Sequence, residues 1–127
     1  MASSLNLAFL GDAVYELFVR ESIVKSEDGR VNTLNKHATE LSKALTQAAI
    51  ADILIKDNYL SEEELTIYKR GRNAKSVSVP KSCTPAQYRK ATGLESLVGY
   101  LHLNGNNKRI REILEYGIGK YHESEKA

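Results

Sequence analysis

The segment from Leu7 to Val19 constrains the fold of this chain more than any other part of the sequence. Its thirteen residues, LAFLGDAVYELFV, include only two charged residues, Asp12 and Glu16, and all the others are apolar, tyrosine or glycine. An α-helix that is apolar on nearly every side has to bury most of its surface. We therefore expect a largely buried helix from Leu5 to about Lys25, with Ser4 as its N-cap.

The rest of the chain also reads as helical. Glycine and proline are sparse, with 8 and 2 copies, and this composition favours helices over strands. Further helices are expected at residues 32–41, 42–56, 61–70, 85–103 and 107–121. Ser61 with Glu64 and Thr84 with Gln87 have the spacing of capping boxes, and Gly71 is expected to end the helix that begins at 61. The prediction is an all-α fold, a compact bundle of about six helices, with one domain at 5–122 and a frayed polar tail at 123–127.

Three features of the sequence argue against a membrane protein or a secreted protein. No apolar run reaches the roughly 18 residues that span a bilayer, so a membrane protein is not expected. The start of the chain, MASSLN, has no basic leader followed by a long apolar stretch, as a secretory signal would. Cys83 is the only cysteine, which fits a reducing compartment. These features predict a cytoplasmic protein.

The two most hydrophobic predicted helices each carry an acid that a buried helix should not contain. Asp12 lies in the first of them, and Glu95 is the only charged residue from Ala91 to Leu103. A buried, ionised carboxylate needs a cation, a proton or an opening to water. Glu16 has Arg20 one turn further on, but neither of the other two acids has such a base. Each acid could still pair with a nearby base or cap a neighbouring helix. Otherwise both point into one polar cleft suited to Mg²⁺, with Mn²⁺ as a substitute.

A second feature is a window without acids. Between Leu65 and Leu94 there are seven bases and no Asp or Glu, while the whole chain has a formal net charge of +2, so the remainder is net −5. A basic window on an acidic body is typical of a site for a polyanion such as nucleic acid, whereas a solvated loop without a ligand is the alternative. The candidate RNA-binding residues are Lys69, Arg70, Arg72, Asn73, Lys75, Ser76, Lys81, Arg89 and Lys90.

Three segments carry a resemblance to a known family. LAFLGDAVYEL at 7–17 and ATGLESLVGYLHLNG at 91–105 resemble the two acidic motifs of the ribonuclease III family, in the right order. With the loop RGRNAKS, the chain is most similar to the branch of that family that consists of the catalytic domain alone. The resemblance covers nearly all of residues 5–121 and implies a ribonuclease III endonuclease-domain fold.

The resemblance also implies roles for individual residues. Asp12 and Glu95 match the two acids that bind metal and catalyse the reaction in the family. Larger members have two further acids, at the positions that are Ala8 and Thr92 here. The two carboxylates that remain suit one Mg²⁺ per site better than a close pair, and the number of metals stays open. The family acts as a two-fold homodimer joined through the first motif. The candidate interface residues are Phe9, Leu10, Ala13 and Leu17.

The implied function is Mg²⁺-dependent cleavage of double-stranded RNA, leaving 5′-phosphate and 3′-hydroxyl ends. The expected role is maturation of the large-subunit ribosomal RNA precursor in a bacterial cytoplasm or a chloroplast, with a ribosomal protein on that RNA as a further partner. Two alternatives remain open at this point. One is a non-catalytic module of the same fold that binds structured RNA, and the other is a helical scaffold protein with structural acids.

Overall fold

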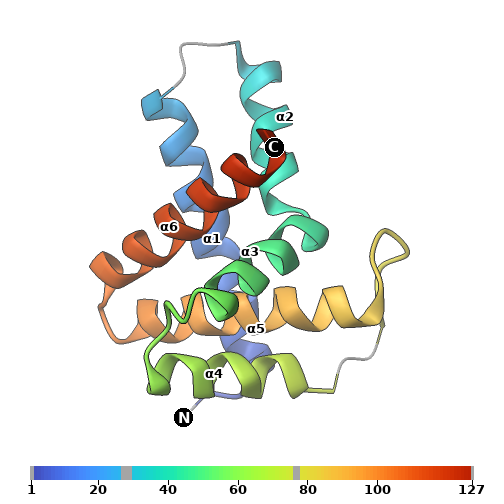
Figure 1. The fold of residues 1–127 in the computed structure, drawn as a ribbon, viewed down its shortest axis with the longest axis vertical. Helices are drawn as coiled ribbons and strands as arrows, with labels where there is room; N and C mark the ends of the chain where they lie inside the picture. The colour runs from blue at the N-terminus through green and yellow to red at the C-terminus, as the bar shows by residue number, and fades with distance from the viewer. Residues whose placement is uncertain (1, 27–29, 76–77, 127) are drawn as a thin grey trace.

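The computed structural model describes residues 2–26, 30–75 and 78–126 (Figure 1). Over these ranges the chain forms six α-helices and no strand, which confirms the predicted all-α fold. No helix in the described ranges is both long and apolar enough to cross a bilayer. The helices are α1 (Ser4–Ser26), α2 (Val31–Ser42), α3 (Ala44–Lys56), α4 (Glu62–Asn73), α5 (Pro85–Leu103) and α6 (Asn107–Lys126).

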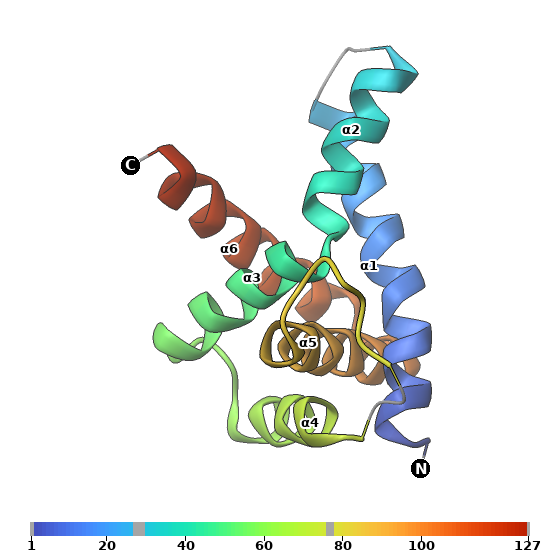
Figure 2. The same ribbon diagram turned by 90° about the vertical axis from the view of Figure 1, so that its right-hand side faces the viewer.

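Helix α5 is the centre of the arrangement. It packs most extensively against α1, and also against α4, α3 and α6. Figure 2 shows α5 nearly end-on, with α1 on its right and α4 below it. The hairpin of α1 and α2 rises away from this centre, and α3 and α6 cover another side of it (Figures 1 and 2). Helix α5 is therefore the element against which four of the other helices are placed.

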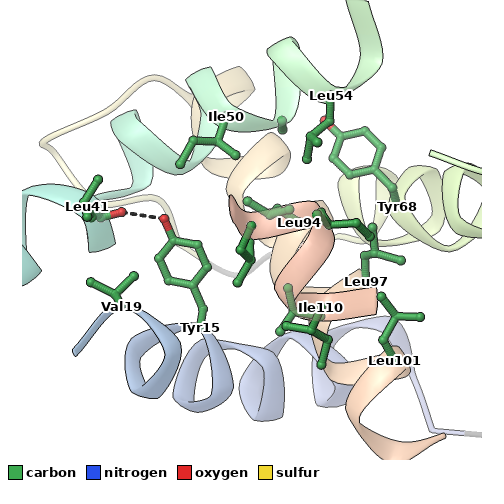
Figure 3. Close-up of a cluster of buried hydrophobic side chains, with 14 of the residues drawn as sticks. Tyr15, Val19, Leu41, Ile50, Leu54, Tyr68, Leu94, Leu97, Leu101 and Ile110 are labelled. Carbon is green, nitrogen blue, oxygen red and sulfur yellow. Dashed lines mark hydrogen bonds between the residues drawn. The ribbon is translucent and has the colours of Figure 1, made fainter. Parts of the chain in front are cut away.

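The core is built from apolar side chains that every helix contributes. Leu94 and Leu97 of α5 are fully buried, and they meet Tyr15 of α1 and Leu54 of α3 in one cluster (Figure 3). The buried hydroxyl of Tyr15 donates a hydrogen bond of 2.7 Å to the backbone carbonyl of Leu41. A buried phenol needs such a partner, and this bond also fixes α1 against the end of α2.

The local start signals act as the sequence predicts, with one exception. At α5, the Thr84 hydroxyl accepts from the Gln87 backbone N–H at 3.1 Å, and the Gln87 side chain accepts from the Thr84 N–H at 2.9 Å. The capping box of Ser61 at α4 is formed in the same way. At α1 the cap is Ser3 and not Ser4, because the hydroxyl of Ser3 accepts from the N–H of Asn6 at 3.1 Å.

Helix α4 runs through Gly71, so the prediction that this glycine ends the helix was wrong. The helix continues to Asn73. A Cβ on Gly71 would overlap the side chain of Ser96 and lie 3.0 Å from the Cα of Gly93, both on α5. The glycine is therefore required for the close approach of α4 to α5 and not for a turn.

Helix α6 is longer than predicted. It reaches Lys126 rather than Tyr121, so the described part of the tail is helical. The residues from 122 to 126 are exposed. Lys120 and Glu123 form a surface ion pair at 3.6 Å within this last stretch. Backbone hydrogen bonds and such pairs sustain the helix without burial.

Candidate active site

The backbones of α1 and α5 are in contact where the two acidic motifs cross. A Cβ on Gly11 would overlap the backbone carbonyl oxygen of Glu95, and a Cβ on Gly99 would overlap that of Leu7. Only glycine leaves room for two helices at this separation. The contact places Asp12, the next residue after Gly11, beside Glu95.

The carboxyl groups of Asp12 and Glu95 lie close enough together for Asp12 to act on the pKa of Glu95. Asp12 is exposed, whereas Glu95 is half-buried. The pKa of Glu95 is raised to about 9, mainly by burial and then by the hydrogen bond and charge of Asp12, while donation from the amide of Gln47 opposes this rise. At neutral pH the Glu95 carboxyl therefore keeps its proton, as expected for a carboxyl group that is buried beside another acid without a cation.

Neither acid is neutralised by a base in the described part of the chain. The ion pairs found there do not include Asp12 or Glu95. Glu16, by contrast, has the predicted pair with Arg20 at 2.8 Å, and its second oxygen accepts from the hydroxyl of Ser42. Of Asp12, Glu16 and Glu95, therefore, only Glu16 fits, within the described residues, the alternative in which the acid is paired with a base.

The two positions expected to carry further acids in larger family members hold buried residues without a carboxylate here. Ala8 and Thr92 are both buried. The hydroxyl of Thr92 donates to the backbone carbonyl of Tyr88, one turn earlier, at 3.0 Å. Among the described residues no group of three or more His, Cys, Asp or Glu is placed to hold a metal ion. The site therefore offers two carboxylates and no third acidic ligand.

One residue at the site was missed by the sequence analysis. Gln47 of α3 has an exposed fraction of 2%, and its amide Nε2 lies 3.5 Å from Oε2 of Glu95. The only signal in the sequence is one long polar side chain within the apolar stretch from Ala44 to Ile55. Its role depends on a contact across 48 residues, which helix periodicity does not indicate.

The basic residues fall on three elements rather than on one loop. Lys69, Arg70, Arg72 and Asn73 lie on the last turns of α4, and Arg89 and Lys90 lie on the first turns of α5. The connecting loop carries Lys75 and Lys81, both exposed, and it projects beyond the start of α5 (Figure 1). Ser76 lies outside the described residues.

The structure changes the expected surroundings of two of these bases. Lys90 forms an ion pair of 2.9 Å with Asp52 of α3, so an acid from another part of the chain enters the acid-free window. The guanidinium of Arg72 lies 5.9 Å from the ring centroid of Tyr68. The exposed Lys69 and Arg70 line a shallow hollow together with the first residues of α1.

Part of α1 is less buried than its composition predicts. Phe9 has an exposed fraction of 85% and Leu17 of 58%. Ala13, which lies between them at helical spacing, is also exposed, and Leu10 is half-buried. The expectation that α1 is buried on most sides therefore fails for this face in a single chain. The result is a continuous apolar strip on an outer surface.

A six-helix domain in which two crossing helices each present one acid, with bases at the start of the second, has the features of a ribonuclease III domain. The chain belongs to this family, because the family model described as "Ribonuclease III domain" matches residues 5–106. Membership confirms the predicted ribonuclease III type of enzyme.

Within the family, the chain is similar to proteins named Mini-ribonuclease 3, which confirms the predicted branch. It is 48% identical to that of Symbiobacterium thermophilum, over 87% of this chain and 84% of the relative. It is 40% identical to that of Enterococcus faecalis, over 96% of this chain and 92% of the relative. A crystal structure of a Fusobacterium nucleatum protein matches with a TM-score of 0.81 and 36% identity, over 93% of each chain.

Proposed function

We propose that this chain is a Mg²⁺-dependent endoribonuclease that hydrolyses phosphodiester bonds of double-stranded RNA and leaves 5′-phosphate and 3′-hydroxyl ends. The observation that carries the proposal is the carboxyl pair of Asp12 and Glu95, which meets at the crossing of α1 and α5 without a base. Family membership and the relatives named Mini-ribonuclease 3 support the reaction class.

The donor set fits Mg²⁺. This ion is commonly bound through one or two carboxylates, with water and substrate phosphate oxygens completing its shell. Asp12 and Glu95 would hold it, and the proton on Glu95 would leave as it binds. When bound, the metal polarises the phosphate and lowers the pKa of a coordinated water. Because Ala8 and Thr92 supply no further carboxylate, the site suits one ion better than a close pair.

The remaining steps belong to the protein's own residues. The crossing of α1 and α5 holds the backbones that carry the two acids close together before RNA arrives. The exposed bases Lys69, Arg70, Lys75, Lys81 and Arg89 are proposed to bind the phosphates of the backbone. An A-form duplex is recognised mainly through its shape, phosphates and 2′-hydroxyls, which suits a surface of lysine and arginine.

A homodimer is the proposed assembly. Phe9, Leu10, Ala13 and Leu17 form the apolar strip on α1, and a two-fold interface places the same strip on both subunits. Large exposed apolar side chains in one patch mark interaction surfaces. A symmetric dimer would present two carboxyl pairs to one duplex, one for each strand.

The proposed cellular role is maturation of the large-subunit ribosomal RNA precursor in a bacterial cytoplasm. The bacterial sources of the similar proteins support the bacterial setting of this proposal. Binding to a ribosomal protein on that RNA is part of the same proposal.

The test compares wild type with Asp12→Asn on a defined RNA duplex in Mg²⁺. Loss of a metal ligand removes several kcal/mol of transition-state stabilisation, which corresponds to a fall in rate of about 10²–10⁴-fold. Glu16→Gln is the matched control, since this acid lies one turn away on α1 but is paired with Arg20. It should cut within a few-fold of wild type. A wild type that binds the duplex but never cuts it would favour the non-catalytic RNA-binding module.

A further inference from the structure

We propose that Gln47 is a positioning residue that holds the carboxylate of Glu95 in the orientation needed to bind the metal. This inference rests on the proposed function, and it adds a side chain from a third helix, α3, to the site. No residue of α3 belongs to either acidic motif. Gln47 would act through Glu95 and would not touch RNA or the reacting atoms.

The first argument is the cost of burying this side chain. Gln47 is 2% exposed, and its neighbours on α3 include the buried Ala48, Ile50 and Ala51. A buried amide without a hydrogen-bond partner costs about 1–3 kcal/mol. The side-chain partner identified for its NH₂ group is Oε2 of Glu95 at 3.5 Å. An apolar residue would pack at this position without that cost, so the amide indicates a requirement at the carboxylate.

The second argument is the rigidity of the frame that holds the amide. Ile50 and Leu54 of α3 pack in the core with Leu94 and Leu97 of α5. Outside the core, the ion pair of Lys90 with Asp52 joins the same two helices. The amide and the carboxylate are therefore carried by two helices that pack together in the core, as a well-positioned site requires.

The third argument is chemical. An amide NH₂ group only donates hydrogen bonds, so it occupies one lone pair of Oε2 and limits rotation of the Glu95 carboxylate. Asp12 approaches the same carboxyl group from α1. The carboxylate is thereby fixed between α1 and α3, and its remaining lone pairs are left for a cation. A separation of 3.5 Å is long, but hydrogen bonds at such sites are often long before the ligand binds.

The experiment measures metal binding without RNA. Mn²⁺ is titrated into the purified protein, and free Mn²⁺ is followed by electron paramagnetic resonance. Gln47→Met keeps the length of the side chain and removes the donor. Outer partners of metal ligands affect affinity by about 10–100-fold, so the Kd for Mn²⁺ should rise by about that factor. Excess Mg²⁺ should restore most of the kcat for RNA cleavage, because Asp12 and Glu95 are intact.

Thr46→Val is the matched control. Thr46 is also 2% exposed, and its hydroxyl donates to the backbone carbonyl of Glu40 at 2.8 Å, away from the two acids. The control should lower the melting temperature by a similar amount and leave the Kd for Mn²⁺ unchanged. If Gln47→Met does not fold, Gln47→Asn replaces it; its amide is one methylene too short to reach Glu95, so the same rise is expected.

The outcomes separate the two proposals. A Kd for Gln47→Met equal to that of wild type, or an equal rise in Gln47→Met and Thr46→Val, overturns the role of Gln47 and leaves the nuclease proposal standing. If wild type binds no Mn²⁺, or if Asp12→Asn binds it as well as wild type, the metal site itself is wrong, and the inference about Gln47 fails with it.

Discussion

The contact between α1 and α5 leaves no room for a single added methyl group at Gly99. In Gly99→Ala the new Cβ would overlap the backbone carbonyl oxygen of Leu7 and lie 3.1 Å from the backbone nitrogen of Gly11. Overpacking of a core side chain usually costs about 1–3 kcal/mol, because neighbouring side chains can move aside. Here the obstacle is helix backbone, which cannot rotate away, so we expect about 3 kcal/mol.

For a chain of this size, 1 kcal/mol shifts the melting temperature by about 3–6 °C. Gly99→Ala should therefore lower it by about 10–15 °C. Gly119→Ala is the matched control: this glycine lies in α6, is exposed, and has nothing within 4 Å of a Cβ. Alanine is preferred over glycine in a helix by about 1 kcal/mol, so this control should melt about 3–5 °C higher.

Thermal unfolding followed by far-ultraviolet circular dichroism measures both shifts. All variants are compared at one protein concentration, because assembly makes the melting temperature concentration-dependent. A Gly99→Ala variant that melts within 2–3 °C of wild type (about the effect of 0.5 kcal/mol) would refute the argument that the two backbones touch. A large destabilisation by Gly119→Ala would show that helical glycines in this protein matter for another reason.

Three further outcomes are expected. Folding raises the pKa of Glu95 from 4.5 to about 9, so between these pH values the folded state binds more protons than the unfolded state, and the stability of the metal-free protein should fall as pH rises. Glu95→Gln should therefore raise the melting temperature more at pH 8 than at pH 5. An equal effect at both pH values would contradict the raised pKa. If Lys75 binds a phosphate, Lys75→Ala should reduce the slope of log K against log salt concentration for binding to duplex RNA by about 1. Lys90→Ala should change this slope less, because the ammonium of Lys90 is already paired with Asp52. Equal slopes in wild type and Lys75→Ala would exclude the contact of Lys75 with a phosphate. In analytical ultracentrifugation, wild type should sediment with twice the chain mass of 14.1 kDa, and Phe9→Glu with the mass of one chain. Ile55→Glu should resemble wild type, because Ile55 is an exposed apolar residue on α3 outside the proposed interface. A monomeric wild type would rule out the dimer.

Signals that act within a few residues were sufficient to predict most helix limits. Thr84 and Gln87 lie three positions apart, and this spacing alone lets each side chain reach the other's backbone N–H. The sequence also showed one acid in each of two apolar segments. This pattern indicated a functional site, because an unpaired charge is costly in a core whatever the tertiary arrangement. The fold class therefore followed from local chemistry, and the proposal of Asp12 and Glu95 as site residues rests on the same kind of signal.

Contacts between distant segments decided the rest. Gly71 has the appearance of a helix end, and only the approach of α5 shows that it serves close packing. Gln47 gains a role through an acid 48 residues away, and Asp52 reaches into a window that is free of acids along the chain. Capping and periodicity depend on neighbours within about one helical turn, whereas these effects depend on which helices are packed together, and that pairing is set by the free energy of burying the whole core.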